Sequence, residues 1–137
     1  MEFGRLLFSS LDFKHIQKKA VGRLKKLLSC SHVSLYIYDQ RKGMLGTSTT
    51  DVKGHEVHVS VMVDEFSFAG YCAHFSAIFH VKNPRDDIRF MREPEFIREL
   101  EVGEFLLMPL VFNGDLLGVV KTVRMSGTRF IESDIEF

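Results

Sequence analysis

Phe105-Leu-Leu-Met-Pro-Leu-Val-Phe112 and Leu116-Leu-Gly-Val-Val-Lys-Thr-Val123 are two apolar runs, and Asn113-Gly114-Asp115 separates them. Asn and Gly tolerate the positive φ angles of a type I′ turn, whose twist matches that of paired antiparallel strands. An Asn-Gly pair between two partly β-branched runs is the strongest local hairpin signal in the chain. We therefore expect the two runs to be neighbouring strands of an antiparallel sheet.

The rest of the chain mixes helical and strand patterns. Apolar residues at steps of three and four predict an amphipathic helix over 12–29. Alternation predicts strands over 33–38 and 56–63, and shorter strands are expected over 44–48 and 78–81. Short helices are expected over 67–75 and 94–100, a loop from residue 83, and the start of a helix over 130–137. Helices interspersed with antiparallel strands, without regular βαβ alternation, indicate the α+β class.

Composition excludes several classes of function. The length suits one domain over 1–137, and eighteen basic residues balance eighteen acidic ones, which gives no electrostatic case for binding nucleic acid. The longest apolar run, 105–112, is far short of the roughly 20 residues that cross a bilayer, so we expect no membrane span. Two distant cysteines, Cys30 and Cys72, are not the framework of a secreted disulfide protein. We expect a cytoplasmic protein.

Several short motifs resemble those of GAF domains, which are small-molecule-sensing modules of signalling proteins. Met108-Pro-Leu110, a polar turn and Leu116-Leu-Gly-Val-Val120 are similar to the C-terminal strands of that family. Phe68-Ala-Gly-Tyr71 resembles its short helix after the third strand, and the segment 83–90 resembles a loop that often carries an Asp-Pro-Arg-Phe-like sequence. The resemblance implies a PAS-related α+β fold, with terminal helices on one face of an antiparallel sheet and a pocket roofed by short helices and loops on the other.

The end of the chain departs from one branch of that family. Cyclic-nucleotide-binding GAF domains carry an Asn-Lys pair after the last strand, then a downstream Phe and an Asp-Glu pair. Here Arg124 and Met125 stand at the Asn-Lys positions, while Phe130 and Asp134 are present and Ile135 replaces the Glu. The resemblance therefore names neither the ligand nor a cofactor.

The resemblance also implies which residues line the pocket. Arg89 would meet an anionic group of the ligand, and the aromatic residues would supply the walls. The alternative for the charged residues of this set is an ordinary solvated loop. The predicted ligand-binding residues are Phe66, Tyr71, His74, Phe75, Asn83, Asp86, Asp87, Arg89 and Phe90.

The resemblance implies a regulatory, non-enzymatic domain excised from a longer signalling protein. We expect it to form a homodimer through its terminal helices, with Ile16, Ala20, Leu24 and Leu27 near the interface, and to relay ligand binding to an attached output domain. Two alternatives stay open: a redox enzyme similar to free methionine sulfoxide reductases with Cys72 as nucleophile, and a GAF-like domain that only dimerises. The histidines and cysteines lack the spacing of a zinc site, so no metal is expected.

Overall fold

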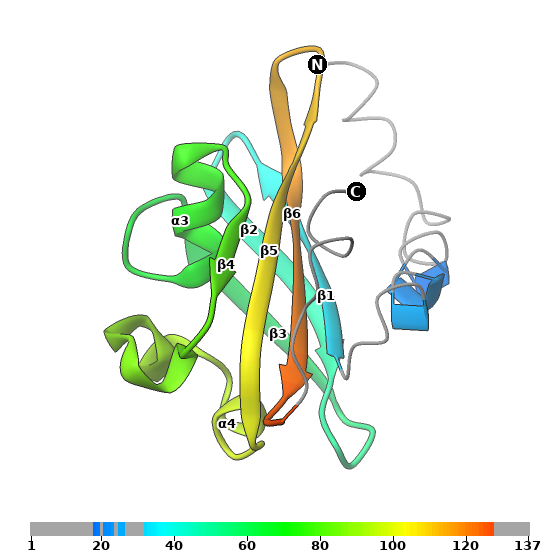
Figure 1. Cartoon of the computed structure of the whole chain (residues 1–137). Helices are drawn as coiled ribbons and strands as arrows, with labels where there is room; N and C mark the ends of the chain where they lie inside the picture. Colours follow the sequence, from blue (N-terminus) through cyan, green and yellow to red (C-terminus); the bar gives the residue numbers. More distant parts are fainter. Residues whose placement is uncertain (1–17, 20, 24, 27–31, 128–137) are drawn as a thin grey trace.

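The computed structural model describes residues 18–19, 21–23, 25–26 and 32–127. Its core is a six-stranded antiparallel sheet with the strand order β3-β2-β1-β6-β5-β4 (Figure 1). The described part of the chain is therefore α+β, as predicted. The strands are β1 (His32–Asp39), β2 (Met44–Thr50), β3 (Glu56–Met62), β4 (Phe79–Val81), β5 (Val102–Phe112) and β6 (Asp115–Met125). The helices between β3 and β5 in the chain are α3 (Phe68–Phe75), the 3₁₀ helices η1 (Pro84–Asp86) and η2 (Ile88–Arg92), and α4 (Glu95–Arg98).

The β5–β6 hairpin confirms the Asn-Gly prediction. Asn113 has a φ of 50° and Gly114 a φ of 80°, and the register pairs Phe112 with Asp115 across the turn. Only glycine and a few polar residues adopt such angles without strain, which fixes the turn at this point of the sequence. β5 begins at Val102, three residues earlier than predicted, and its first residues contain a register shift between Val102 and Glu104.

The sheet separates two apolar clusters, because successive strand residues point to opposite faces. On one face, α3 contributes Phe68 and Cys72 to a cluster that includes Phe105 of β5. On the other face, Val33 belongs to a smaller cluster that receives Val21. Figure 1 shows α3 and the helical residues between 18 and 26 on opposite sides of the sheet. The described residues of the predicted 12–29 helix are helical, whereas its remainder and the predicted 130–137 helix lie outside the described residues.

The segment between β4 and β5 is more ordered than the sequence indicates. The predicted loop from residue 83 contains η1 and η2, and α4 is shorter than the predicted 94–100 helix. Asp87 starts η2, because its carboxylate accepts a hydrogen bond from the Arg89 amide at 2.9 Å. η1 and η2 span only three and five residues, too few to show a 3.6-residue periodicity, which explains why they were not predicted.

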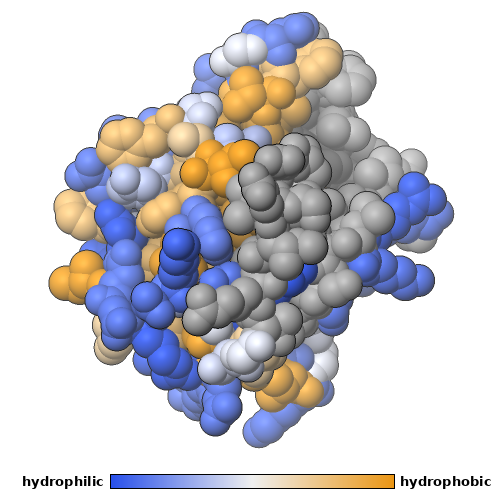
Figure 2. Space-filling view, in the orientation of Figure 1, coloured by the Kyte–Doolittle hydropathy of each residue, from blue (hydrophilic) through white to orange (hydrophobic). Residues whose placement is uncertain are grey.

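The tip of the β5–β6 hairpin extends beyond the rest of the sheet (Figure 1). Leu110, Val111 and Phe112 are all exposed there. Figure 2 shows apolar residues near the top of the view, over the end of this hairpin. This tip therefore presents exposed apolar side chains.

Candidate functional site

A groove of about 680 Å³ lies along the β3 edge of the sheet. The β2–β3 turn and β3 form one wall, and the end of η2 together with α4 forms the other. Val57, Val59 and Phe96 give the groove apolar surface, while charged side chains and two histidines surround them. The lining residues are Asp51, Val52, Lys53, His55, Val57, His58, Val59, Ser60, Arg92, Pro94, Glu95, Phe96 and Glu99.

The β2–β3 turn is held by the carboxylate of Asp51. Its Oδ1 accepts hydrogen bonds from the backbone amides of Lys53 and His55 at 2.9 and 2.8 Å. The bond from the His55 amide is the main cause that lowers the pKa of Asp51. Gly54 adopts a φ of 85° within the turn. The turn thus has a defined shape and presents Val52 and Lys53 to the groove.

Side chains of α4 anchor the opposite wall of the groove to the sheet. Ile97 is buried in the main core cluster, and the Phe96 ring lies 5.4 Å from the His32 ring of β1 in an edge-on arrangement. The side chain of Arg98 donates a hydrogen bond to the Glu93 carbonyl oxygen at 3.0 Å. We call residues 88–98 the η2–α4 segment. Its position depends on these few side chains, because it makes no strand pairing with the sheet.

An ion pair is buried beneath the η2–α4 segment. Lys121 of β6 is 1% exposed and pairs with the carboxylate of Glu93, which is 7% exposed. The Lys121 ammonium also hydrogen-bonds the Tyr36 side chain and lies 5.2 Å from the centre of the Phe105 ring. A sheet face packed against helices is normally apolar, so a charged pair at this depth is unusual.

Electrostatics keep Lys121 charged. Burial acts to lower the pKa of Lys121, but the neighbouring Glu93 carboxylate and Tyr36 outweigh it, so that the pKa is raised overall. Burial raises the pKa of Tyr36, whose hydroxyl therefore keeps its proton. The arrangement presents an ammonium group and a phenolic hydroxyl side by side, both able to donate hydrogen bonds to an anion.

His32 extends the polar surface toward the groove. Its Nε2 and the Thr49 hydroxyl are 2.9 Å apart. Burial, with smaller contributions from the charges of Lys121 and Lys25, lowers the pKa of His32 from 6.5 to about 4. The imidazole is therefore neutral at physiological pH, and it serves as a hydrogen-bonding group rather than a cation.

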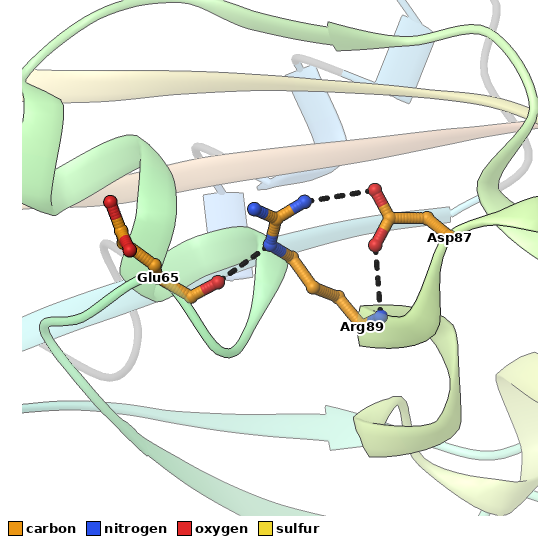
Figure 3. Close-up of polar contacts among 3 residues, drawn as sticks. All are labelled: Glu65, Asp87 and Arg89. Atoms are coloured by element: carbon orange, nitrogen blue, oxygen red, sulfur yellow. Dashed lines mark hydrogen bonds and ion pairs between the residues drawn. The ribbon is translucent and has the colours of Figure 1, made fainter.

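The sequence-predicted binding residues on α3 form an aromatic cluster with Arg89. The Tyr71 ring lies 4.6 Å from that of Phe75, and the His74 ring lies 4.8 Å from that of Phe75. The Arg89 guanidinium lies 4.5 Å from the Tyr71 ring centre, and it also binds the Glu65 carbonyl oxygen and the Asp87 carboxylate (Figure 3). Arg89 is therefore already engaged by groups of the protein itself.

The other predicted residues are spread over the surface and the core. Phe90 is buried in the main cluster, whereas Phe66 is 62% exposed and lies against the Arg92 guanidinium. Asn83 and Asp86 line a separate depression of about 290 Å³ beside the start of β5. None of the nine residues lines the 680 Å³ groove. Their role in binding a ligand stays a prediction.

Cys72 lies on the inner side of α3. Its side chain is fully buried and its thiol donates a hydrogen bond to the Ala77 carbonyl oxygen at 3.2 Å. Burial raises the pKa of the thiol from 9.0 to about 12. A thiolate is the nucleophile in thiol chemistry, so this environment is unfavourable for Cys72 as a reactive group.

Sequence reasoning missed the groove and the buried ion pair. Strand β3 and a helix near α4 were both predicted. The groove forms only where these two segments, about forty residues apart in the chain, lie close together in the fold. One signal was visible in the sequence: Lys121 interrupts the apolar run 116–123, where a strand of the sheet centre would have an uncharged residue.

The described residues contain neither a metal-ligand cluster nor a membrane-spanning helix. No group of three or more histidine, cysteine, aspartate or glutamate side chains in that part of the chain could hold a metal ion. Within the same residues, no helix is long and apolar enough to cross a membrane.

Comparison with known proteins identifies the family. The model of the GAF domain family matches residues 12–137. The GAF domain from Acinetobacter phosphoenolpyruvate-protein phosphotransferase shares 19% identity and a TM-score of 0.72, covering 97% of this chain and 79% of that one. The GAF domain of a two-component sensor histidine kinase from Bacillus halodurans shares 16% identity and a TM-score of 0.66, covering 92% and 84%. Type II free methionine-R-sulfoxide reductase from Thermoplasma acidophilum shares 14% identity and a TM-score of 0.62, covering 97% and 82%. No curated protein matches the chain significantly. The solved structures show the shared fold, and the family match over residues 12–137 shows that this chain belongs to the GAF domain family.

Proposed function

We propose that this chain is a ligand-sensing regulatory domain that binds a small molecule in the groove between β3 and α4. The groove itself is the observation that carries the proposal: an apolar strip of Val57, Val59 and Phe96 lies among charged and polar side chains, which together suit a small polar molecule with an apolar part. One wall belongs to the sheet and the other to the η2–α4 segment. Ligand binding would therefore favour one position of that segment.

Relay to an attached output domain would use both faces of the sheet. β1 carries His32 on the groove side, and Val33 of the same strand packs in the cluster that holds Val21 on the helix side. A shift of β1 on ligand binding would move that N-terminal helical region. We further propose that the chain dimerises through its predicted terminal helices, over 12–29 and 130–137, in a longer cytoplasmic signalling protein. GAF neighbours in a sensor kinase and a methyl-accepting chemotaxis protein support a signalling context.

The regulatory role is favoured over a thiol enzyme because of the environment of Cys72. One structural neighbour is a free methionine sulfoxide reductase, so the fold alone does not decide between these roles. The buried thiol with a pKa of about 12 carries the preference for a binding domain. We place the ligand in the groove rather than at Arg89, because the guanidinium already has protein partners.

Blocking the groove tests the proposal. Val57→Trp places a large ring in the groove from a strand, where aromatic residues are well tolerated. Val111→Trp is the matched control, since it changes an exposed strand valine at the hairpin tip. Native mass spectrometry of the purified proteins and a metabolite library screened by NMR should reveal a ligand that wild type and Val111→Trp bind and Val57→Trp loses. A ligand that all three proteins bind equally would place binding elsewhere.

A further inference from the structure

The Lys121–Glu93 pair joins the sheet to the η2–α4 wall of the groove. Lys121 lies on β6, at the centre of the sheet, where Ser34 of β1 is its register partner. Glu93 lies in the η2–α4 segment, and its two neighbours in the chain, Arg92 and Pro94, both line the groove. The carboxylate thus reaches inward from the groove wall and ends on the ammonium group.

A buried pair of this kind is a poor source of stability. Removing two charges from water costs several kcal/mol for each ion, and an apolar pair of similar size is often as stable or more stable. The charged pair is therefore better explained by what Lys121 can bind than by what it contributes to folding. If Glu93 moves away, the ammonium requires another negative group, because an isolated buried charge is strongly unfavourable.

The side chains of Thr47 and His32 each carry a buried polar atom that has no hydrogen-bond partner among the described residues. Thr47 follows Leu45 by two residues on β2 and so faces the same side of the sheet as Leu45 and Tyr36, which share one core cluster. Its hydroxyl is buried and, among the described residues, has no hydrogen-bond partner; the same is true of Nδ1 of His32. Buried polar groups in proteins are normally paired, so these two are candidates to contact a bound molecule.

We infer that Lys121 is the anion-binding point of the ligand site, and that the Glu93 carboxylate occupies it in the closed, ligand-free form. The inference rests on the proposed function and specifies its chemistry: the ligand carries a carboxylate, which takes the place of the Glu93 side chain on the Lys121 ammonium and the Tyr36 hydroxyl. Displaced Glu93 moves outward with the η2–α4 segment, which opens the groove toward Thr47 and His32.

A carboxylate fits this point better than other groups. The internal occupant is itself a carboxylate, and an ammonium with an adjacent hydroxyl provides charge-assisted hydrogen bonds to two oxygen atoms. A neutral ligand that displaced Glu93 would leave the lysine buried without a counter-charge. The same competition makes the site a switch, because the ligand binds only the form in which Glu93 has left, and so shifts the population toward it.

NMR titration of the intact chain tests the inference directly. Sodium acetate, sodium succinate and sodium phosphate are added to ¹⁵N-labelled wild type, with sodium chloride at equal ionic strength as the reference. We expect saturable carboxylate-specific shifts at the backbone amides of residues 92, 93, 95 and 96 and of Tyr36 and Lys121. Glu93→Gln, which removes the internal competitor's charge, should bind the carboxylates about tenfold more tightly than wild type. Phosphate binding without carboxylate binding would overturn the assigned ligand class.

Two variants control the experiment. Lys121→Met/Glu93→Gln removes both charges together, leaves no unpaired ion, and should weaken carboxylate binding by about tenfold or more. Glu101→Gln removes an exposed acid that follows α4 and lies outside the groove, and it should bind as wild type does. Absence of a saturable response in wild type, equal binding by the double variant, or no gain in Glu93→Gln would overturn the inference.

The outcomes also separate this inference from the proposed function. If Val57→Trp blocks a ligand that the double variant still binds, the groove is the site and Lys121 is not its anion-binding point. If carboxylates bind through Lys121 and Val57→Trp has no effect, the anion point stands and the assignment of the groove fails.

Discussion

Acid should destabilise this domain through His32. Its pKa is about 4 in the folded protein, against 6.5 for an ordinary histidine, because of burial and the nearby charges of Lys121 and Lys25. The folded pKa is the lower one, so between these two values the unfolded chain binds the proton more readily than the folded chain does. The stabilisation from a neutral His32 is therefore complete above pH 6.5 and is lost as the pH falls to about 4.

The size of the effect follows from the two pKa values. At pH 4.5 nearly all unfolded chains carry the proton on His32, whereas only roughly a quarter of folded chains do. Each tenfold difference in proton binding corresponds to about 1.4 kcal/mol. The free energy of unfolding should therefore fall by about 2.5 kcal/mol between pH 7 and pH 4.5 through this residue alone.

Urea denaturation of wild type and His32→Gln at pH 7 and pH 4.5 isolates this contribution. The glutamine amide can replace Nε2 in the hydrogen bond to Thr49 but does not titrate. At pH 7 the variant should be less stable by about 1 kcal/mol, because it loses the ring contact with Phe96. At pH 4.5 it should be the more stable protein, since acid effects on all other groups cancel in the comparison.

The result that refutes this reasoning is a stability difference between wild type and His32→Gln that is the same at both pH values. His74→Gln is the matched control, because it removes an exposed histidine from α3. If His74→Gln changes the pH dependence as much as His32→Gln does, the burial of His32 is not the cause.

Three further predictions concern single side chains. Gly114→Val should lower the free energy of unfolding by about 1 kcal/mol or more, because a β-branched residue fits a φ of 80° poorly; an unchanged thermal midpoint would contradict the turn assignment. Arg89→Ala should cost about 1–2 kcal/mol in urea denaturation, because it removes an ion pair and the stacking on Tyr71, both only partly exposed; a neutral effect would mean that the side chain is free in solution. In a Cys30→Ser background, Cys72 should react with a thiol reagent only after urea is added, and rapid reaction of the folded protein at pH 7.5 would restore the thiol-enzyme alternative.

The strands could be predicted because their signals are local. The Asn113-Gly114 pair specifies the hairpin through the backbone angles of two adjacent residues, and the Val57, Val59, Val61 alternation specifies which side of β3 faces the core. The mixture of helical and strand patterns indicated the α+β class, and the family resemblance then supplied the arrangement with short helices on one face of the sheet. The helices η1 and η2 were missed, because their hydrogen bonds depend on caps such as the Asp87 carboxylate rather than on a repeated apolar pattern.

The groove could not be predicted from local patterns, because its walls meet through long-range packing. Phe96 belongs to a four-residue helix, and its role depends on contact with His32, sixty-four residues earlier in the chain. Arg89 shows the converse: a charged loop residue resembles a ligand-binding group in sequence, yet the structure satisfies it with the Glu65 carbonyl oxygen and Asp87. Sequence gives the chemistry of a side chain, whereas its availability to a ligand depends on the neighbours that the fold brings to it.

The polar residues at the centre of the sheet depart most clearly from the expectation that buried positions are apolar. Lys121, the orphaned hydroxyl of Thr47 and the neutral His32 each cost free energy relative to apolar residues of similar size. All three face the side of the sheet covered by the η2–α4 segment, and none belongs to the apolar cluster that receives Val21 on the other face. Departures from an apolar core that gather at one place are expected at functional sites, where stability is given up for binding. These unfavourable groups therefore add to the support that the groove gives for a ligand beneath α4, since apolar residues in their places would often leave the fold as stable or more stable.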